Sequence, residues 1–285
     1  MTWEVAVAGT FHSDDVTTPA GRRDVLGGSA VYFALAASRF APVHVNGIVG
    51  VDTAAEFRRL LGAPAIHLDG MVVSDLPTFR WHAVHDFERW ATSHESAEPG
   101  CDPEWRPVLP KPSRQAEVLF VASMDPRLQR DVLDQSAARL IGTDSMTEFI
   151  ERRPAEVLSV VERVDILFLT SAELGVLTGN DDWHAAAAGL LGRGRVRAVV
   201  VKRGPRGAAC VTAGAAIEMA AVPVARVVDP TGAGDALAGG FLGHVARSGQ
   251  VDETAFDAAL IEGMRCAADA VVAFGTAGLG GTRTV

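Results

Sequence analysis

The most informative segment of the chain is Asp229-Pro230-Thr231-Gly232-Ala233-Gly234-Asp235. An apolar stretch leads into it, and the small residues that follow, Ala236-Leu-Ala-Gly-Gly-Phe241, favour a helix. Because glycine has no side chain, the backbone at Gly232 and Gly234 can turn tightly and approach a ligand closely. The free N–H groups at the start of the next helix, together with the helix dipole, make an anion site. The segment therefore predicts a site for a phosphate group or for negative charge that develops during a reaction.

Asp235 lies at the same helix start. A carboxylate there can accept the proton of a substrate hydroxyl that lies beside a bound phosphate, which is the general-base arrangement that phosphoryl transfer uses. The alternative is structural, because Gly-Ala-Gly-Asp is also what a turn followed by an aspartate N-cap looks like. These four residues alone leave both interpretations open.

Strands and helices are predicted to alternate along most of the chain. Near the N-terminus, Glu4–Thr10 and Val43–Val49 have the pattern of buried strands, and Ala30–Arg39 and Thr53–Leu61 that of helices. Further along, the pattern predicts strands at 117–122, 139–143, 165–170 and 197–203, helices at 127–138, 154–163, 171–178, 182–192, 234–248 and 253–273, and a short antiparallel pair at Gly207–Thr212 and Ala216–Ala221. This alternation is typical of an α/β domain with a parallel sheet and helices on its faces.

The segment from about 69 to 110 interrupts the alternation. Thr78–Val84 and Phe87–Thr92 are rich in aromatic residues and flank the short connection His85-Asp86, so they predict a β-hairpin. Residues 96–112 are dense in Pro, Glu and Gly and predict a loop. We interpret the insertion as a small β lid beside the main domain.

Composition excludes several classes of protein. The net charge of −9 over 285 residues argues against a bulk nucleic-acid binder, which needs a basic face. Three widely spaced cysteines without a Cys-x-x-Cys fit a reducing compartment better than a disulfide framework. The N-terminal residues lack the basic segment of a signal peptide, and no apolar run approaches the roughly 18 residues of a membrane span. We therefore expect a cytoplasmic protein that binds neither membrane nor nucleic acid.

The extended motif resembles the C-terminal signature of the PfkB (ribokinase-like) carbohydrate kinase family, usually written D-T-x-G-A-G-D. Three more segments resemble the family in the same chain order: V-A-G-T-F-H-S-D-D at 7–15, G-G-S-A-V-Y-F-A-L-A-A-S-R-F at 27–40, and V-V-V-K-R-G-P-R-G at 199–207. The resemblance implies one ribokinase-like domain over 1–285, a three-layer α/β/α sandwich whose small β-sheet lid comes mainly from about 69–110 with part of 14–26. It also implies ATP-dependent phosphorylation of a hydroxyl of a sugar, nucleoside or cyclitol, with Mg²⁺ and, in members with a monovalent-cation loop, K⁺. Lids of this family often pair between subunits, so a homodimer through the lid is an expectation.

The resemblance also implies residue roles. Asp235 matches the catalytic base, and Gly232, Ala233 and Gly234 match the anion hole for the transferred phosphate. The acceptor side corresponds to Asp14, Gly27, Gly28, Tyr32 and Asp144, and the nucleotide side to Lys202, Arg203, Gly204, Gly207, Thr231 and Gly275. Asp229 matches a position beside the monovalent-cation loop, and Glu173 matches the glutamate that organises Mg²⁺ through water. For Arg203 and Arg206, a solvated turn is the alternative to a phosphate contact.

Three positions depart from the family pattern. Thr170 stands where the family often has the asparagine of Asn-x-x-Glu, Tyr32 replaces a ribokinase asparagine, and Gly-Thr-Asp-Ser-Met around Asp144 replaces an Asp-Pro-Asn-type segment. Ribose is therefore not the expected acceptor. Aromatic side chains could pack against a ring or base instead, or simply form core and lid packing: Tyr32, Phe79, Trp81, Phe87 and Trp90.

Other chemistries are disfavoured. The sequence has no Walker-A motif, no H-E-x-x-H and no G-x-S-x-G. His82, His85 and His94 lack metal-ligand spacing, and His12 is interpreted as a packed loop histidine or a substrate contact. Two alternatives to a sugar or nucleoside kinase stay open: a non-catalytic, regulatory ligand-binding member of the same fold, and a kinase of a vitamin-like heterocycle.

Overall fold

The computed structural model describes residues 2–87 and 91–280 of the chain. Within them, a large sheet has the strand order β13-β12-β11-β10-β9-β8-β1-β4-β5, in which the strands from β11 to β5 are parallel and β12 and β13 are antiparallel. Its strands are β1 Val5–Ala8, β4 Val43–Gly50, β5 Ile66–Ser74, β8 Val118–Val121, β9 Leu140–Asp144, β10 Ile166–Thr170, β11 Ala198–Lys202, β12 Ala208–Thr212 and β13 Ala216–Met219.

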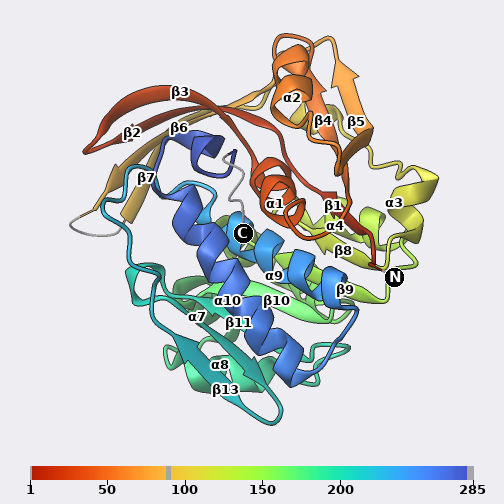
Figure 1. The fold of residues 1–285 in the computed structure, drawn as a ribbon, viewed down its shortest axis with the longest axis vertical. Helices are drawn as coiled ribbons and strands as arrows, with labels where there is room; N and C mark the ends of the chain where they lie inside the picture. The colour runs from red at the N-terminus through yellow and green to blue at the C-terminus, as the bar shows by residue number, and fades with distance from the viewer. Residues whose placement is uncertain (1, 88–90, 281–285) are drawn as a thin grey trace.

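Helices cover both faces of this sheet (Figure 1). One face packs against α1 Ser29–Ala37, α2 Ala54–Leu60, α9 Ala233–Ser248 and α10 Glu253–Ala270. The other face packs mainly against α4 Pro126–Leu133, α5 Thr147–Arg152, α6 Pro154–Val161, α7 Ser171–Thr178 and α8 Trp183–Leu190. The short elements are α3 Lys111–Gln115 and the 3-10 turns η1 Asp102–Glu104, η2 Gly204–Arg206 and η3 Gly275–Gly278. The predicted three-layer α/β/α sandwich is confirmed.

Close contact between α1 and α9 follows from their small residues. A Cβ placed on Gly239 of α9 would lie 2.4 Å from the Phe33 carbonyl oxygen of α1, so only glycine allows the two helices to approach this closely. The α9 helix also packs over β1 and β8. These strands flank the point where the strand order reverses, and ligands bind at that point in open α/β sheets.

The lid is a four-stranded sheet with the order β3-β2-β6-β7. Its strands are β2 His12–Thr18, β3 Gly21–Gly27, β6 Phe79–Asp86 and β7 Ala91–Glu98. Figure 1 shows it as an arched sheet set apart from the large one. Side chains alternate between the faces of a strand, so Asp14 and Trp81, which pair across β2 and β6, share one face, and Asp15 and His82 share the other.

Several boundaries differ from the sequence prediction. Residues 69–74 belong to β5 of the large sheet and not to the lid, and Asp14 lies within lid strand β2 and not in a loop. The first hairpin strand runs on to Asp86, two residues past its predicted end, and the second begins at Ala91 where a start at Phe87 was predicted; residues 96–98 are strand where a loop was expected. The α4 helix ends at Leu133, whereas the predicted helix ran to residue 138. The α3 and α5 helices were not predicted, because helices of five or six residues leave little periodicity in the sequence.

No helix in the described residues is long and apolar enough to cross a membrane. The three cysteines, Cys101, Cys210 and Cys266, are free and buried. Burial raises the pKa of each thiol, to about 11, 12 and 11 respectively. These thiols are therefore small core residues and not reactive groups.

Asp165, just before β10, joins three neighbouring segments and provides a test of the fold. Its side chain is fully buried, and one carboxylate oxygen accepts the Ile141 amide at 2.9 Å and the Arg195 guanidinium at 3.0 Å. Arg197 lies 3.2 Å from the other oxygen. We expect Asp165→Ala to lower the free energy of unfolding by about 1–3 kcal/mol, because a buried amide loses its partner.

Urea denaturation measures this loss. Glu148→Ala is the matched control, since Glu148 forms an exposed i,i+4 pair with Arg152 and should change stability by less than about 0.5 kcal/mol. Equal stability of the two variants would contradict a joining role for Asp165.

Candidate active site

Three adjacent parallel strands end in polar residues at the same edge of the sheet. Asp144 ends β9, Thr170 ends β10 and Lys202 ends β11, and the strand pairing sets Thr170 opposite Lys202. This is the carboxyl edge of the parallel strands, where α/β proteins bind ligands.

The N-terminus of α9 lies at this edge. Gly232 is its N-cap in the left-handed conformation, with φ of 74°, which favours glycine. Asp235 is in the first turn. The Ala233 amide donates to the Pro230 carbonyl at 3.3 Å, so Ala233 is the least available of the predicted anion-hole amides. Gly234 has an ordinary helical conformation, and its lack of a side chain matters for another reason: a Cβ there would lie 3.1 Å from Lys202 Nζ.

Lys202 is the cation among three carboxylates. Its Nζ lies 4.0 Å from Asp144 Oδ2, and its charge also interacts with Glu173 and Asp235. Burial lowers the pKa of Lys202, but the carboxylates outweigh it and the net shift is upward. Burial likewise raises the pKa of Asp144 well above its usual range, against the opposing effect of Lys202. The ammonium therefore stays charged at neutral pH.

Asp235 has a pKa suited to proton transfer near neutrality. Burial raises the pKa of its carboxyl to about 6, while Lys202 acts in the opposite direction. A carboxylate with a pKa just below the working pH is ionised and still able to take a proton. Its position at a helix N-terminus and beside a lysine is compatible with proton transfer next to a phosphate group.

Asp14 forms the second buried acidic position. It projects from the inner face of β2, is 1% exposed, and burial raises its pKa to about 6. A Cβ on Gly27 would lie 2.7 Å from its Oδ2, so the glycine makes room for the carboxylate. Among the described residues, Asp14 Oδ1 has no hydrogen-bond partner. An unpaired buried oxygen of this kind is available to a ligand hydroxyl.

His12 lies between two carboxylates and not in a loop. Its Nδ1 is 3.8 Å from Asp14, its Nε2 is 3.7 Å from Asp102, and its ring stacks on Phe79 at 4.3 Å. Burial lowers the pKa of His12, yet the neighbouring aspartates raise it to a value above the usual one. The role of His12 could not be predicted from the sequence, because its partner Asp102 lies 90 positions away in the chain.

Tyr32 fills the space above the motif. It is 1% exposed, and a Cβ on Gly232 would lie 2.2 Å from its ring, so the ring sits directly on the loop. Its hydroxyl has no hydrogen-bond partner in the part of the chain that the structure describes. Burial raises the pKa of this phenol, so it is an un-ionised donor.

Asp229 fastens the loop from within. Its side chain is fully buried, and its two oxygens accept the amides of Thr231 and Gly275, each at 2.9 Å. Thr231 is also hydrogen-bonded to His85 of the lid, with 2.9 Å between Oγ1 and Nε2. The sequence analysis considered His85 only as a metal ligand, because nothing in its local spacing points to the motif.

The nucleotide-side turn is ordered by side chains of its own. Arg203 donates to Glu218 at 2.7 Å, and its guanidinium lies over the Trp183 ring at 4.9 Å. These contacts use Arg203 to shape the turn, whereas Arg206 is exposed. Gly204 and Gly207 both have positive φ, of 57° and 90°.

Thr170 and Glu173 form a reciprocal capping box at the start of α7. Thr170 Oγ1 accepts the Glu173 amide at 3.1 Å, and Glu173 accepts the Thr170 amide at 2.7 Å. The threonine that replaces the expected asparagine therefore caps a helix. In the described residues, no group of three or more His, Cys, Asp or Glu side chains could hold a metal directly.

The aromatic side chains divide between the core and the lid. Tyr32 is in the core, Phe79 stacks on His12, and Trp81 meets His85 edge-on at 6.3 Å. Phe87 follows β6, and Trp90 lies outside the described residues. Core and lid packing therefore accounts for the three whose contacts are known.

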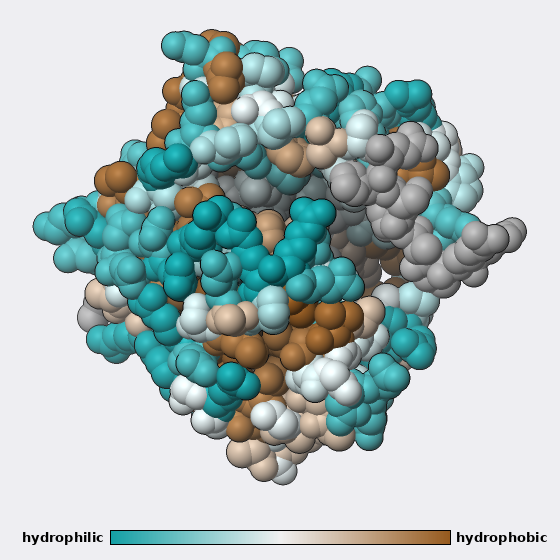
Figure 2. Space-filling model, turned by 180° about the vertical axis from the view of Figure 1, so that it is seen from behind, coloured by the Kyte–Doolittle hydropathy of each residue, from teal (hydrophilic) through white to brown (hydrophobic). Residues whose placement is uncertain are grey.

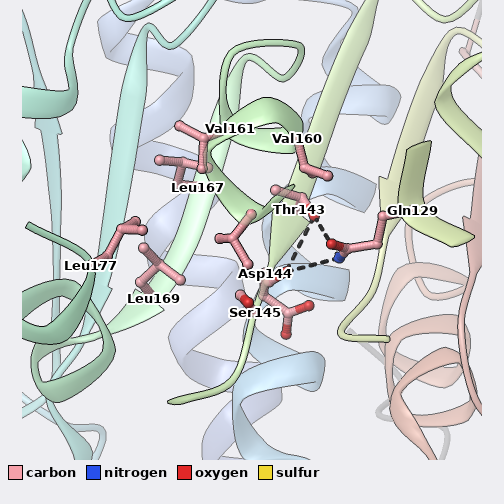
Figure 3. A pocket seen from close by; sticks show the side chains of 10 residues that line it. Gln129, Thr143, Asp144, Ser145, Val160, Val161, Leu167, Leu169 and Leu177 are labelled. Carbon is pink, nitrogen blue, oxygen red and sulfur yellow. Dashed lines mark hydrogen bonds between the residues drawn. The ribbon is translucent and has the colours of Figure 1, made fainter. Parts of the chain in front are cut away.

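A small pocket lies behind Asp144, on the other side of the sheet edge. Figure 3 shows Gln129 reaching across to Thr143 and to the Asp144 carbonyl, with aliphatic residues such as Leu167 and Leu169 beside them. Its volume of about 10 Å³ is that of a water molecule, so it is a packing gap and not a substrate site. Figure 2 shows a wider hollow near the middle of this face of the molecule.

Comparison with known proteins agrees with this geometry. The profile described as "pfkB family carbohydrate kinase" matches residues 5–277. A cytidine kinase of Thermococcus kodakarensis is 28% identical over 259 residues, covering 88% of this chain and 91% of the relative.

Two solved structures show the same fold. The adenosine kinase of Sinorhizobium meliloti has a TM-score of 0.80 at 18% identity, over 96% of this chain and 95% of its own. The nucleoside kinase of Burkholderia thailandensis in complex with inosine has a TM-score of 0.74 at 19% identity, over 95% and 92%.

An α/β phosphotransferase that acts on an alcohol group is the class that fold and profile define. The chain belongs to the pfkB family of carbohydrate kinases.

The pKa of Asp235 gives a test of the electrostatics. Because the Lys202 charge lowers this pKa, we expect Lys202→Met to raise it clearly above about 6. Carbon-13 NMR titration of aspartate carboxyl groups would measure the shift, and Arg203→Gln should leave it unchanged. An unaltered Asp235 pKa in Lys202→Met would show that the ammonium does not face this carboxylate.

Proposed function

We propose that this chain is a nucleoside kinase that transfers the terminal phosphoryl group of ATP to a hydroxyl of the acceptor. The observation that carries the proposal is the meeting, at one edge of the sheet, of Asp235, Lys202 and the start of α9. The curated relatives named as cytidine kinase and nucleoside kinase support a nucleoside over a free sugar or cyclitol.

The acceptor site is proposed around Asp14. A hydroxyl donating to Asp14 Oδ1 would supply the partner that this buried oxygen lacks within the described residues. The Gly27–Gly28 backbone lies beside it, and the Tyr32 hydroxyl offers a donor nearby. Charge-assisted hydrogen bonds of this kind fix the orientation of a polyhydroxylated ligand.

The reaction follows from the charges. The Asp235 carboxylate removes the proton of the acceptor hydroxyl as its oxygen attacks the γ-phosphorus, and the bond to the ADP oxygen breaks. The amides at the start of α9, above all that of Gly234, and the Lys202 ammonium stabilise the charge on the transferred group. The turn at Gly204 and Gly207, with Thr231 and Gly275, is proposed to face the nucleotide.

Mg²⁺ fits this site through water. Asp144 and Glu173 supply the carboxylate oxygens that the ion prefers, and Asp144 Oδ1 has no hydrogen-bond partner among the described residues. When bound with the nucleotide, the ion neutralises phosphate charge. A monovalent cation beside Asp229 and a dimer formed through the lid stay proposals; both Asp229 oxygens already accept backbone amides.

A coupled ADP-release assay tests the proposal. We expect turnover with nucleosides such as cytidine, and weaker or no turnover with ribose and myo-inositol. Asp235→Asn should fold and bind ATP yet lose roughly 10²–10⁴-fold in kcat, the scale of a positioned base. Saturable nucleoside binding without ADP release in the unmodified protein would favour the non-catalytic alternative, and wild-type kcat in Asp235→Asn would contradict the base assignment.

The pH profile separates the two acidic residues. Asp14 and Asp235 must both be ionised in the free enzyme, and burial raises the pKa of each to about 6. We therefore expect log(kcat/KM) for the acceptor to be level at higher pH and to fall with a slope approaching 2 below about pH 6. Asp14→Asn should reduce this slope to 1, because a single ionisation remains; an unchanged slope would contradict the role of Asp14.

Asp14→Ala and Asp15→Ala form a matched pair, because they are neighbours on opposite faces of β2. Asp15, which was expected to face solvent or cap a turn, is 5% exposed and bound to Arg22 and His82 on the outer face. We expect Asp14→Ala to weaken acceptor binding by roughly 10–150-fold, since each hydrogen bond to a charged group contributes about 1.5–3 kcal/mol.

Isothermal titration with the acceptor and with an ATP analogue measures both affinities. ATP-analogue affinity should change little in either variant. A larger acceptor defect in Asp15→Ala than in Asp14→Ala would place the acceptor on the other face of the lid.

A further inference from the structure

We infer that His85 is a positioning residue that couples the lid to the phosphate-binding loop at the start of α9. The inference rests on the proposed kinase function and concerns a residue to which neither the sequence motifs nor the family comparison gives a role. It starts from one contact: His85 Nε2 of β6 is hydrogen-bonded to Thr231 Oγ1 at 2.9 Å.

This contact links two parts of the fold that are far apart in sequence. His85 belongs to the lid sheet, whereas Thr231 directly precedes Gly232, the N-cap of α9. The His85 side chain is 5% exposed, so the bond is shielded from water and is not a surface contact. Trp81, four positions earlier on the same face of β6, meets the imidazole ring edge-on and limits its movement.

A second contact also restrains the Thr231 side of the loop. Asp229 accepts the Thr231 amide at 2.9 Å, so both the backbone and the side chain of Thr231 are held by hydrogen bonds. Gly232 follows immediately in a left-handed conformation, and a small displacement of Thr231 is passed on to the Gly234 amide at the helix start. The His85–Thr231 bond therefore helps to set the orientation of the groups that face the phosphate.

The same lid sheet carries Asp14 on its inner face. Asp14, proposed to bind the acceptor, and His85, which binds Thr231, are therefore held by the same sheet. The contact thus ties the position of the phosphate-binding loop to that of the lid strand beside the proposed acceptor site.

The charges around His85 are compatible with a neutral, hydrogen-bonding imidazole. Burial lowers the pKa of His85, and the Asp229 carboxylate, 3.8 Å from Nε2, opposes this only in part. At pH 7 the ring is therefore neutral, and its bond to the Thr231 hydroxyl is one between neutral groups.

A double-mutant cycle with His85→Ala, Thr231→Val and the double variant tests the coupling. We expect each single variant to lower kcat by roughly 3- to 10-fold, the scale of one neutral hydrogen bond, and His85→Ala to leave the KM for ATP nearly unchanged. The double variant should be no slower than the slower single one, because both remove the same contact. His85→Gln, which keeps a nitrogen donor of similar reach, should recover much of the loss.

His82→Ala is the matched control. His82 lies on the same strand but on the outer face, 3.2 Å from Asp15, and should leave kcat unchanged. Effects of His85→Ala and Thr231→Val that multiply in the double variant, or a loss in His82→Ala equal to that in His85→Ala, would overturn the inference.

Hydrogen exchange separates this inference from the proposed function. With a non-hydrolysable ATP analogue bound, the amides of residues 231–235 should exchange faster in His85→Ala and Thr231→Val than in the unmodified protein or His82→Ala. This readout needs no acceptor, so failure to phosphorylate any nucleoside would overturn the proposed function alone. Unchanged exchange in both single variants would overturn the coupling even if the protein is a kinase.

Discussion

The close contact between α1 and α9 is the constraint on which the site depends. With Gly239 against the Phe33 carbonyl, the two helices lie nearer than ordinary side chains permit, and this helps to fix where α9 begins beside Lys202 at the sheet edge. The same approach brings Tyr32 of α1 onto Gly232. One packing contact therefore positions both the start of α9 and the Tyr32 ring above Gly232, and the small residues that follow the motif are required by this packing.

The second organising effect is electrostatic. Asp144, Glu173 and Asp235 are brought around a single lysine in a buried setting, where each charge strongly influences the others. Such a cluster costs stability unless a ligand or a cation shares it. The raised pKa of Asp235 is thus a property of the assembled strand ends and helix start, and no single element would produce it.

The sequence was informative where the signal was local. The motif at 229–235, the alternation of strands and helices and the Gly27–Gly28 segment are short-range patterns. The alternation predicted a parallel sheet with helices on its faces, and the family resemblance carried by the motifs implied the three-layer sandwich and the residues that lie at the sheet edge. The contacts of His12 with Asp102 and of His85 with Thr231 join positions 90 and 146 residues apart, so no local pattern contains them. From the sequence, Thr170 was noted only as a departure from the asparagine that the family often has. Its role in the capping box depends on where α7 begins, which the structure shows. Residues 69–74 were assigned to the lid, because the sequence of a strand next to a hairpin does not indicate which of two sheets the strand joins.

The strands of the lid come from two separate parts of the chain. Its central pair joins β2, at residues 12–18, with β6, at residues 79–86, in parallel. Parallel pairing requires a long crossover, and here the crossover passes through α1, β4, α2 and β5 of the main body. In the chain, the β2–β3 hairpin comes first, and its partner strand β6 follows only after these four elements of the body. Contacts of such high sequence separation form slowly, so the lid should be among the last parts of the protein to reach its final pairing. The lid is therefore not one contiguous piece of chain, and no single deletion could remove it without also removing α1, β4, α2 and β5 of the body.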